Sequence, residues 1–165
     1  MVLILECMII CFILLVPCVV AIANGIHNAA FLFERDVQDR VVEMGLVTKE
    51  RLDRNKKVFK FTTLLIMVAF VIWAVYGING ARGFWSPFWQ IYVLAMAEGI
   101  FDRFFIDWYW VGHTKAWTIP GTEDLKPYIP KKTLIVKWVI TIIGNPVIAA
   151  AIAGIMFLFF GRCSL

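Results

Sequence analysis

The chain has 165 residues, of which 61% are hydrophobic and only 17% are charged, and its formal net charge is +4. Soluble domains are typically about half apolar and about a quarter charged, so a soluble protein of this length and composition would expose more apolar surface than one core can bury. The composition excludes an ordinary soluble domain and predicts an all-α integral membrane protein.

Four apolar stretches are long enough to cross a bilayer, which needs about 20 helical residues at a rise of about 1.5 Å per residue. Their approximate bounds are residues 2–25, 61–80, 87–111 and 134–160. We therefore expect a bundle of four transmembrane helices that forms a single membrane domain over residues 1–165. The first stretch is expected to be a retained span, because no basic residue precedes it and Glu6 lies where a signal peptide carries positive charge.

The first connection, residues 26–60, is predicted to extend the bundle as a helical hairpin in the cytoplasm. Val37 and Val41 fall at helical spacing, which indicates that the first span continues as a helix past the membrane. Gly45 is expected to end this helix in a left-handed conformation, and Thr48 to cap a second helix that runs directly into the second span.

Basic residues predict the orientation of the spans. The first connection holds Arg35, Arg40, Lys49, Arg51, Arg54, Lys56, Lys57 and Lys60, and the third holds Lys115, Lys126, Lys131 and Lys132. The opposite side offers only Arg82 and Arg162. By the positive-inside rule, both connections face the cytoplasm, and both ends of the chain lie on the non-cytoplasmic side of a plasma or cytoplasmic membrane.

The basic residues of the first connection favour anchoring beside anionic lipid headgroups. Nucleic-acid binding is not expected, because residues 49–57 interleave no aromatic side chain with their Lys and Arg. The third connection, residues 112–133, contains Pro120-Gly121 and two further prolines, which favour an ordered, turn-rich loop. We expect this loop, with Glu123 and Asp124, to cover a polar pocket that opens to the cytoplasmic side.

The third span carries ionisable groups where lipid disfavours them, and such groups normally face the bundle interior and mark a site. At about 100° per residue, one stripe of the helix is predicted to contain Glu98, Asp102, Ile106, Tyr109 and His113. Arg103 and Asp107 fall on an adjoining face.

Arg103 and Asp107 are spaced i,i+4, so they either neutralise each other or bind an anionic headgroup or phosphate through the guanidinium. Glu98 and Asp102 lie one turn apart and repel each other in a low dielectric. They are therefore candidates, with His113, for acid–base catalysis or for binding a proton or cation. Satisfaction of both carboxylates by Arg103 or by a hydroxyl of another helix is the structural alternative.

A shallower group of polar residues is expected near the cytoplasmic face. Counting helical rise puts His27 level with Asp107 and His113, so these three side chains are predicted to meet. No spacing typical of a metal site is present, and the sequence identifies no cofactor or metal. Asn24, Asn28 and Asn145 are expected to line the same pocket, with Asn145 near mid-membrane beside a proline.

The preferred functional hypothesis is a polar intramembrane pocket that binds or processes a lipid or another lipophilic substrate. The first alternative is a small oligomeric transporter or ion pathway coupled to protons or cations. The second is a non-catalytic accessory or scaffold subunit of a membrane complex. The expected partners are membrane lipids, together with further copies of the chain or a larger membrane complex.

Overall fold

The computed structural model describes residues 1–160, in which every regular element is helical. In chain order these elements are α1 (Val2–Ala23), the 3₁₀ helix η1 (Ile26–Leu32), α2 (Arg35–Glu43), α3 (Lys49–Ile72), the π-helix η2 (Trp73–Ile78), α4 (Trp85–Phe101), the π-helix η3 (Asp102–Val111), the 3₁₀ turn η4 (Glu123–Leu125) and α5 (Lys131–Phe160). The predicted all-helical class is confirmed. Arg162, which was predicted to lie on the side opposite the two basic connections, is outside the described residues.

Among residues 1–160, three helical runs are long and apolar enough to cross a membrane: Val2–Ala23, Lys49–Ile78 and Lys131–Phe159. They correspond to α1, to α3 with η2, and to α5. A further run forms because α4 passes into η3 without an intervening loop, from Trp85 to Val111. Its second half carries the ionisable residues that the sequence singled out.

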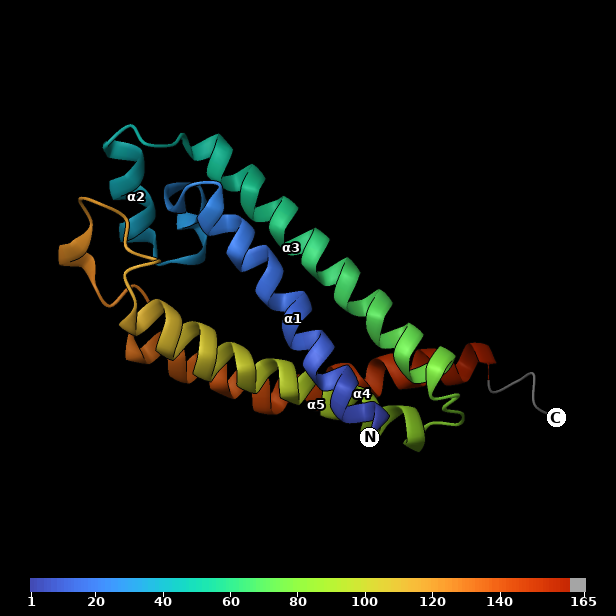
Figure 1. Cartoon of the computed structure of the whole chain (residues 1–165). Coiled ribbons are helices and arrows are strands. Elements are labelled where there is room, and N and C mark those ends of the chain that lie inside the picture. Colours follow the sequence, from blue (N-terminus) through green and yellow to red (C-terminus); the bar gives the residue numbers. More distant parts are fainter. Residues whose placement is uncertain (161–165) are drawn as a thin grey trace.

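The helices form two arms that meet at one end and splay apart toward the other (Figure 1). One arm consists of α1 and α3, and the other consists of α4, η3 and α5. At the closed end, near the N-terminus, a core packs apolar side chains from all four helical runs, among them Ile10, Val75, Leu94 and Ala149. At the splayed end, the separation of the two arms leaves room for other segments of the chain to pack between them.

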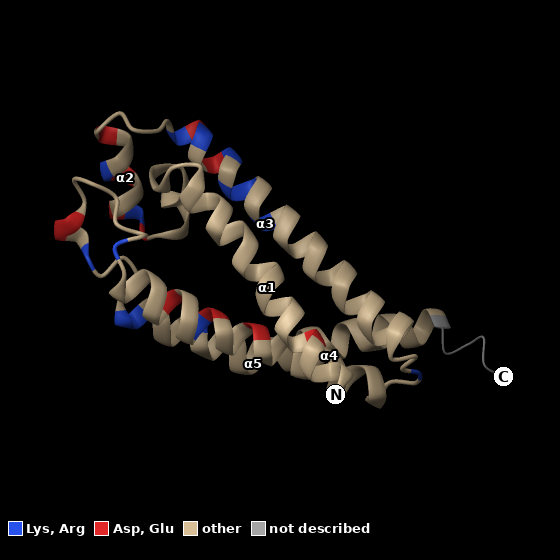
Figure 2. Ribbon diagram, in the orientation of Figure 1, with Lys and Arg blue, Asp and Glu red and all other residues tan. Residues whose placement is uncertain are grey.

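A second core fills the splayed end, where α2, η1 and the 112–130 connection lie (Figure 1). Val37 and Val41 of α2 are fully buried against it, together with Trp117 and Ile119 of the loop. The loop is thus an ordered part of the fold, as its prolines predicted. Most of the charged residues lie at this end, with a further row along α4 and η3 (Figure 2).

The turn before α3 follows the sequence prediction. Gly45 has φ of 70°, and the amides of Gly45 and Leu46 donate to the carbonyls of Val42 and Val41, which is a Schellman ending of α2. Thr48 accepts a hydrogen bond from the Arg51 amide and so caps α3. From there α3 runs through its basic residues into the apolar segment without interruption.

The predicted extension of the first span past the membrane is wrong. Helix α1 ends at Ala23, and Gly25 has φ of 92°, a left-handed conformation that glycine adopts without steric cost. The chain then forms η1 and passes through an extended Phe33 before α2 begins. Val37 and Val41 do share a buried helical face, but on a separate short helix.

Candidate functional site

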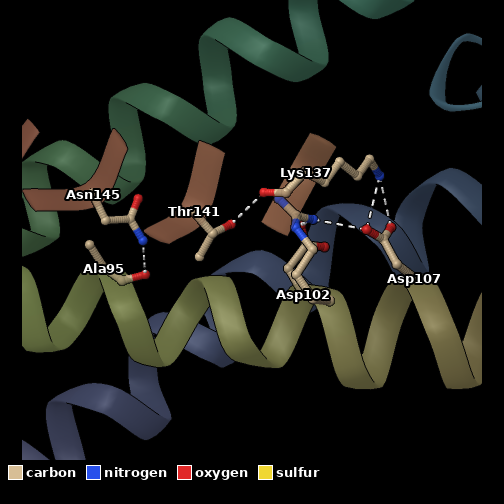
Figure 3. Close-up of polar contacts among 7 residues, drawn as sticks. Ala95, Asp102, Asp107, Lys137, Thr141 and Asn145 are labelled. Atoms are coloured by element: carbon tan, nitrogen blue, oxygen red, sulfur yellow. Dashed lines mark hydrogen bonds and ion pairs between the residues drawn. The ribbon is translucent and has the colours of Figure 1, made fainter. Parts of the chain in front are cut away.

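The ionisable residues of the third helical run form a cluster that α5 completes (Figure 3). The Asp107 carboxylate accepts hydrogen bonds from Arg103 at 2.9 Å and from Lys137 Nζ at 2.9 and 3.0 Å. Arg103 also pairs with its neighbour Asp102. Only 5% of the Asp107 side chain is exposed, so this carboxylate needs such partners.

The charges of this cluster balance one another, which indicates that it stabilises the packing of the helices. Two carboxylates, Asp102 and Asp107, face two cations, Arg103 and Lys137, so the four formal charges cancel. The half-buried Glu98 lies outside this set and forms no ion pair or hydrogen bond within residues 1–160. Lys137 was missed as a partner, although it is the one basic residue of the stretch 134–160.

The predicted stripe through this run is wrong beyond Ile106, because residues 102–111 form a π-helix. Hydrogen bonds from i to i+5 widen each turn, so successive residues rotate by less than 100°. The buried residues are consequently Ile106, Asp107 and Val111, whereas Tyr109 is half exposed and His113 is exposed. The π-helix is what turns Asp107 inward toward Lys137.

The structure does not place the two histidines and Asp107 in one contact. His27 shares a hydrogen bond with Asn28 at 3.1 Å, and the His113 ring lies 2.7 Å from the Trp108 carbonyl. Among residues 1–160, no group of three or more His, Cys, Asp or Glu side chains is arranged to hold a metal. These histidines are therefore satisfied locally.

The remaining loop and helix candidates also have structural partners. Glu123 accepts a hydrogen bond from the Gly121 amide, and Asp124 forms an exposed ion pair with Arg40 of α2 at 3.3 Å. Asn145 donates to the Ala95 carbonyl at 2.9 Å and so joins α5 to α4 (Figure 3). These contacts hold segments together.

Close packing between α4 and α5 leaves no room for a ligand there. A Cβ on Gly99 would lie 2.6 Å from the Thr141 methyl and 3.3 Å from the Asn145 amide. Ala149 and Ala153 continue the same interface and are fully buried. Small residues let the backbones approach, as is usual between membrane helices.

A cleft of about 450 Å³ lies instead between α1 and α3, and η1 contributes to its lining. This α1–α3 cleft is lined by Pro17, Val20, Ala21, Asn24, Asn28, Ala29, Phe31, Arg51, Arg54, Asn55, Val58, Phe59, Thr62 and Thr63. A second, almost wholly apolar space of about 360 Å³ adjoins it and is lined by Ile13, Val16, Pro17, Val20, Thr62, Thr63 and Ile66. The two spaces share four residues, so they form one groove.

The local sequence explains why the two helices part here. Asn24 and Gly25 end α1, and η1 then lies against α3, where Phe31 packs edge-on to Phe59 with ring centroids 5.5 Å apart. Asn55 donates to the Asn28 carbonyl at 3.2 Å. The short η1 thus lines part of the cleft, a position that it reaches because α1 ends at Ala23 instead of continuing as a helix.

Polarity changes along the cleft. Arg51 and Arg54 are exposed at its mouth, near the charged start of α3 (Figure 2), and neither forms an ion pair within residues 1–160. Beyond Asn55 the lining is mostly apolar, with the two small hydroxyl residues Thr62 and Thr63, and ends at Ile66. Of these residues, the sequence prediction included only Asn24 and Asn28 as candidates to line a pocket. The missed signal was the spacing of residues 51, 54, 55, 58 and 62, which share one helical face.

A separate polar network closes the other end of the molecule and was also missed. Glu6, only 2% exposed, accepts hydrogen bonds from Asn79 at 3.0 and 3.1 Å, and Asn79 also donates to Gln90 at 2.9 Å. This contact joins α1, the end of η2 and α4. It depends on long-range neighbours that no local pattern reveals.

Comparison with known proteins adds no further constraint, since no family model, curated protein or solved structure matches this chain.

Proposed function

We propose that the chain is a four-span membrane protein that binds a lipid of the cytoplasmic leaflet in the α1–α3 cleft. The observation that carries the proposal is the continuity of this cleft, from a charged mouth to an apolar groove, between two helices of membrane-spanning length. Sites that are mostly apolar with a few placed polar groups, and of about 300–1,000 Å³, are typical of ligand pockets.

The proposed fourth span is the run from Trp85 to Val111. Its paired charges are compatible with a membrane because the carboxylates of Asp102 and Asp107 balance the cations of Arg103 and Lys137 within the bundle. In this topology the splayed end, with α2, the start of α3 and the 112–130 loop, faces the cytoplasm. The concentration of basic residues there supports that orientation.

Binding is better supported than catalysis or ion transport. The acids of η3 are paired with cations, and His113 contacts Trp108 on an exposed face. Within residues 1–160, no contact joins His113 to Glu98 and Asp102 in a catalytic group. A proton or cation pathway would need successive groups with free capacity. The α1–α3 cleft, by contrast, offers two cations that have no ion-pair partner in the described part of the chain, above a mostly apolar groove.

A tryptophan at Val20 tests the proposal, because Val20 lines both parts of the cleft. Val19 is the matched control, since it is equally exposed at 49% and lines neither part. The full-length protein is extracted in mild detergent, supplied with a bacterial polar lipid extract and examined by native mass spectrometry. We expect Val20→Trp to lose most of the lipid bound by the wild type, and Val19→Trp to retain it.

Equal lipid retention by the two variants, both with wild-type melting temperatures, would contradict the proposal. A wild-type protein that carries no lipid would contradict it as well. The same spectra report whether copies of the chain form a homo-oligomer.

A further inference from the structure

We infer that the lipid in the α1–α3 cleft is an anionic phospholipid whose phosphate is held by Arg51 and Arg54 and whose acyl chain lies in the apolar groove. This inference rests on the proposed function, and it specifies the chemical class of the ligand.

The charge of the cleft lining is one-sided. Its side chains include two guanidiniums and no carboxylate. The two arginines lie three residues apart, which places them on one face of α3, one above the other. A guanidinium presents several N–H donors in a plane and binds phosphate oxygens in pairs, so two of them suit one phosphate.

The surrounding helix adds to the positive potential. Residues 49–60 contain six basic residues, Lys49, Arg51, Arg54, Lys56, Lys57 and Lys60, and two acidic ones, Glu50 and Asp53, which gives this segment a net charge of +4. A zwitterionic headgroup would bring its own cation into this field, whereas a net anionic headgroup brings none. Basic residues near a membrane surface attract anionic lipid.

The length of the cleft distinguishes a phospholipid from a soluble phosphate. Arg54 and Ile66 are separated by twelve residues of α3, or about 18 Å of helix. One leaflet of the hydrocarbon core is about 15 Å thick. The groove therefore extends from the headgroup level to the bilayer centre, while a free phosphate would occupy only the mouth.

The polar residues between these ends suit the ester region of a lipid. The side-chain amides of Asn24 and Asn28 donate to the carbonyls of Val20 and Asn24 at 3.0 and 2.8 Å, which satisfies the last turn of α1. The cleft therefore passes through a band of amides before it becomes apolar. A phospholipid has the same order of chemistry, from phosphate through glycerol esters to acyl chain.

The test uses delipidated full-length protein and an equimolar mixture of phosphatidylglycerol and phosphatidylcholine with identical acyl chains. Native mass spectrometry measures how much of each lipid is retained. We expect the wild type to prefer phosphatidylglycerol by about tenfold, and Arg51→Gln/Arg54→Gln to abolish that preference. The control Lys57→Gln/Lys60→Gln removes the same amount of charge from residues outside the cleft lining. We expect this control to keep most of the preference for phosphatidylglycerol.

Three results would overturn the inference. The first is lipid binding without headgroup preference, which leaves the proposed function standing. The second is an equal loss of preference in the arginine and lysine pairs, which would reduce the effect to general surface charge. The third is a combination of two observations: millimolar inorganic phosphate displaces phosphatidylglycerol, and Val20→Trp does not change phosphatidylglycerol binding. The mouth of the cleft would then be a site for soluble anions. A protein that binds neither lipid would overturn the proposed function itself.

Discussion

The two arms of this molecule use polar residues in opposite ways. Between α4 and α5, polar and charged side chains find partners on the facing helix, and Gly99 allows the backbones to approach closely. Between α1 and α3, Arg51 and Arg54 are left without ion-pair partners among residues 1–160, beside a cleft of about 450 Å³. In the proposal above, the binding site is therefore not marked by the ionisable residues of α4 and η3. It lies where two arginines have no ion-pair partner within residues 1–160, beside an open groove.

The largest expected effect belongs to the paired arm. Asp107→Ala leaves Arg103 and Lys137 without their shared carboxylate in a mostly buried position, and breaking a buried pair costs about 3–5 kcal/mol. Unfolding of the detergent-solubilised protein, followed by circular dichroism during heating, measures this loss. Asp124→Ala is the control, because its ion pair with Arg40 is exposed and contributes less than about 1 kcal/mol. Similar melting temperatures for the two variants would remove the distinction between the arms.

A smaller loss is expected from Gly99→Ala. The added methyl group would meet Thr141 at 2.6 Å, and overpacking of this kind costs about 1–3 kcal/mol. Gly144→Ala on α5 is the matched control, since its Cβ meets only Ile140 of its own helix, at the ordinary distance of 3.6 Å. The comparison is made by thermal unfolding, and a Gly99→Ala variant as stable as Gly144→Ala would show that α4 and α5 are less closely packed than described.

The smallest effect is expected on the other arm. Thr48→Ala removes the hydrogen bond to the Arg51 amide and costs about 1 kcal/mol or less, because the cap is exposed. We expect faster amide hydrogen exchange in the first turn of α3 and unchanged exchange in α4 and α5. Exchange that accelerated throughout the molecule would mean that the start of α3 is coupled to the whole fold.

Local signals in the sequence predicted local structure well. Gly45 and Thr48 each imply a conformation through their own backbone or side chain, and both were placed correctly. The i,i+4 spacing of Arg103 and Asp107 also predicted their ion pair. These features depend on residues within one or two turns of each other, so the sequence contains what is needed to find them.

Features that depend on distant neighbours were not predictable in this way. Lys137 lies 30 residues from Asp107, and its role follows from how α5 packs on η3. The π-helix of residues 102–111 has no clear local signature, yet it changes which side chains face inward. The α1–α3 cleft depends on the break at Gly25 and on where η1 then packs.

The network at Glu6 has a consequence for how the protein is made. Glu6 and its partner Asn79 are 73 residues apart, and ribosomes add about 5–20 residues per second, so the carboxylate waits roughly 4–15 seconds for that amide. Glu6 lies near the N-terminal end of α1, where water can solvate its carboxylate until then. The network of Glu6, Asn79 and Gln90 can thus close only after Asn79 and Gln90 have been synthesised, which ties assembly of the closed end to the order of translation.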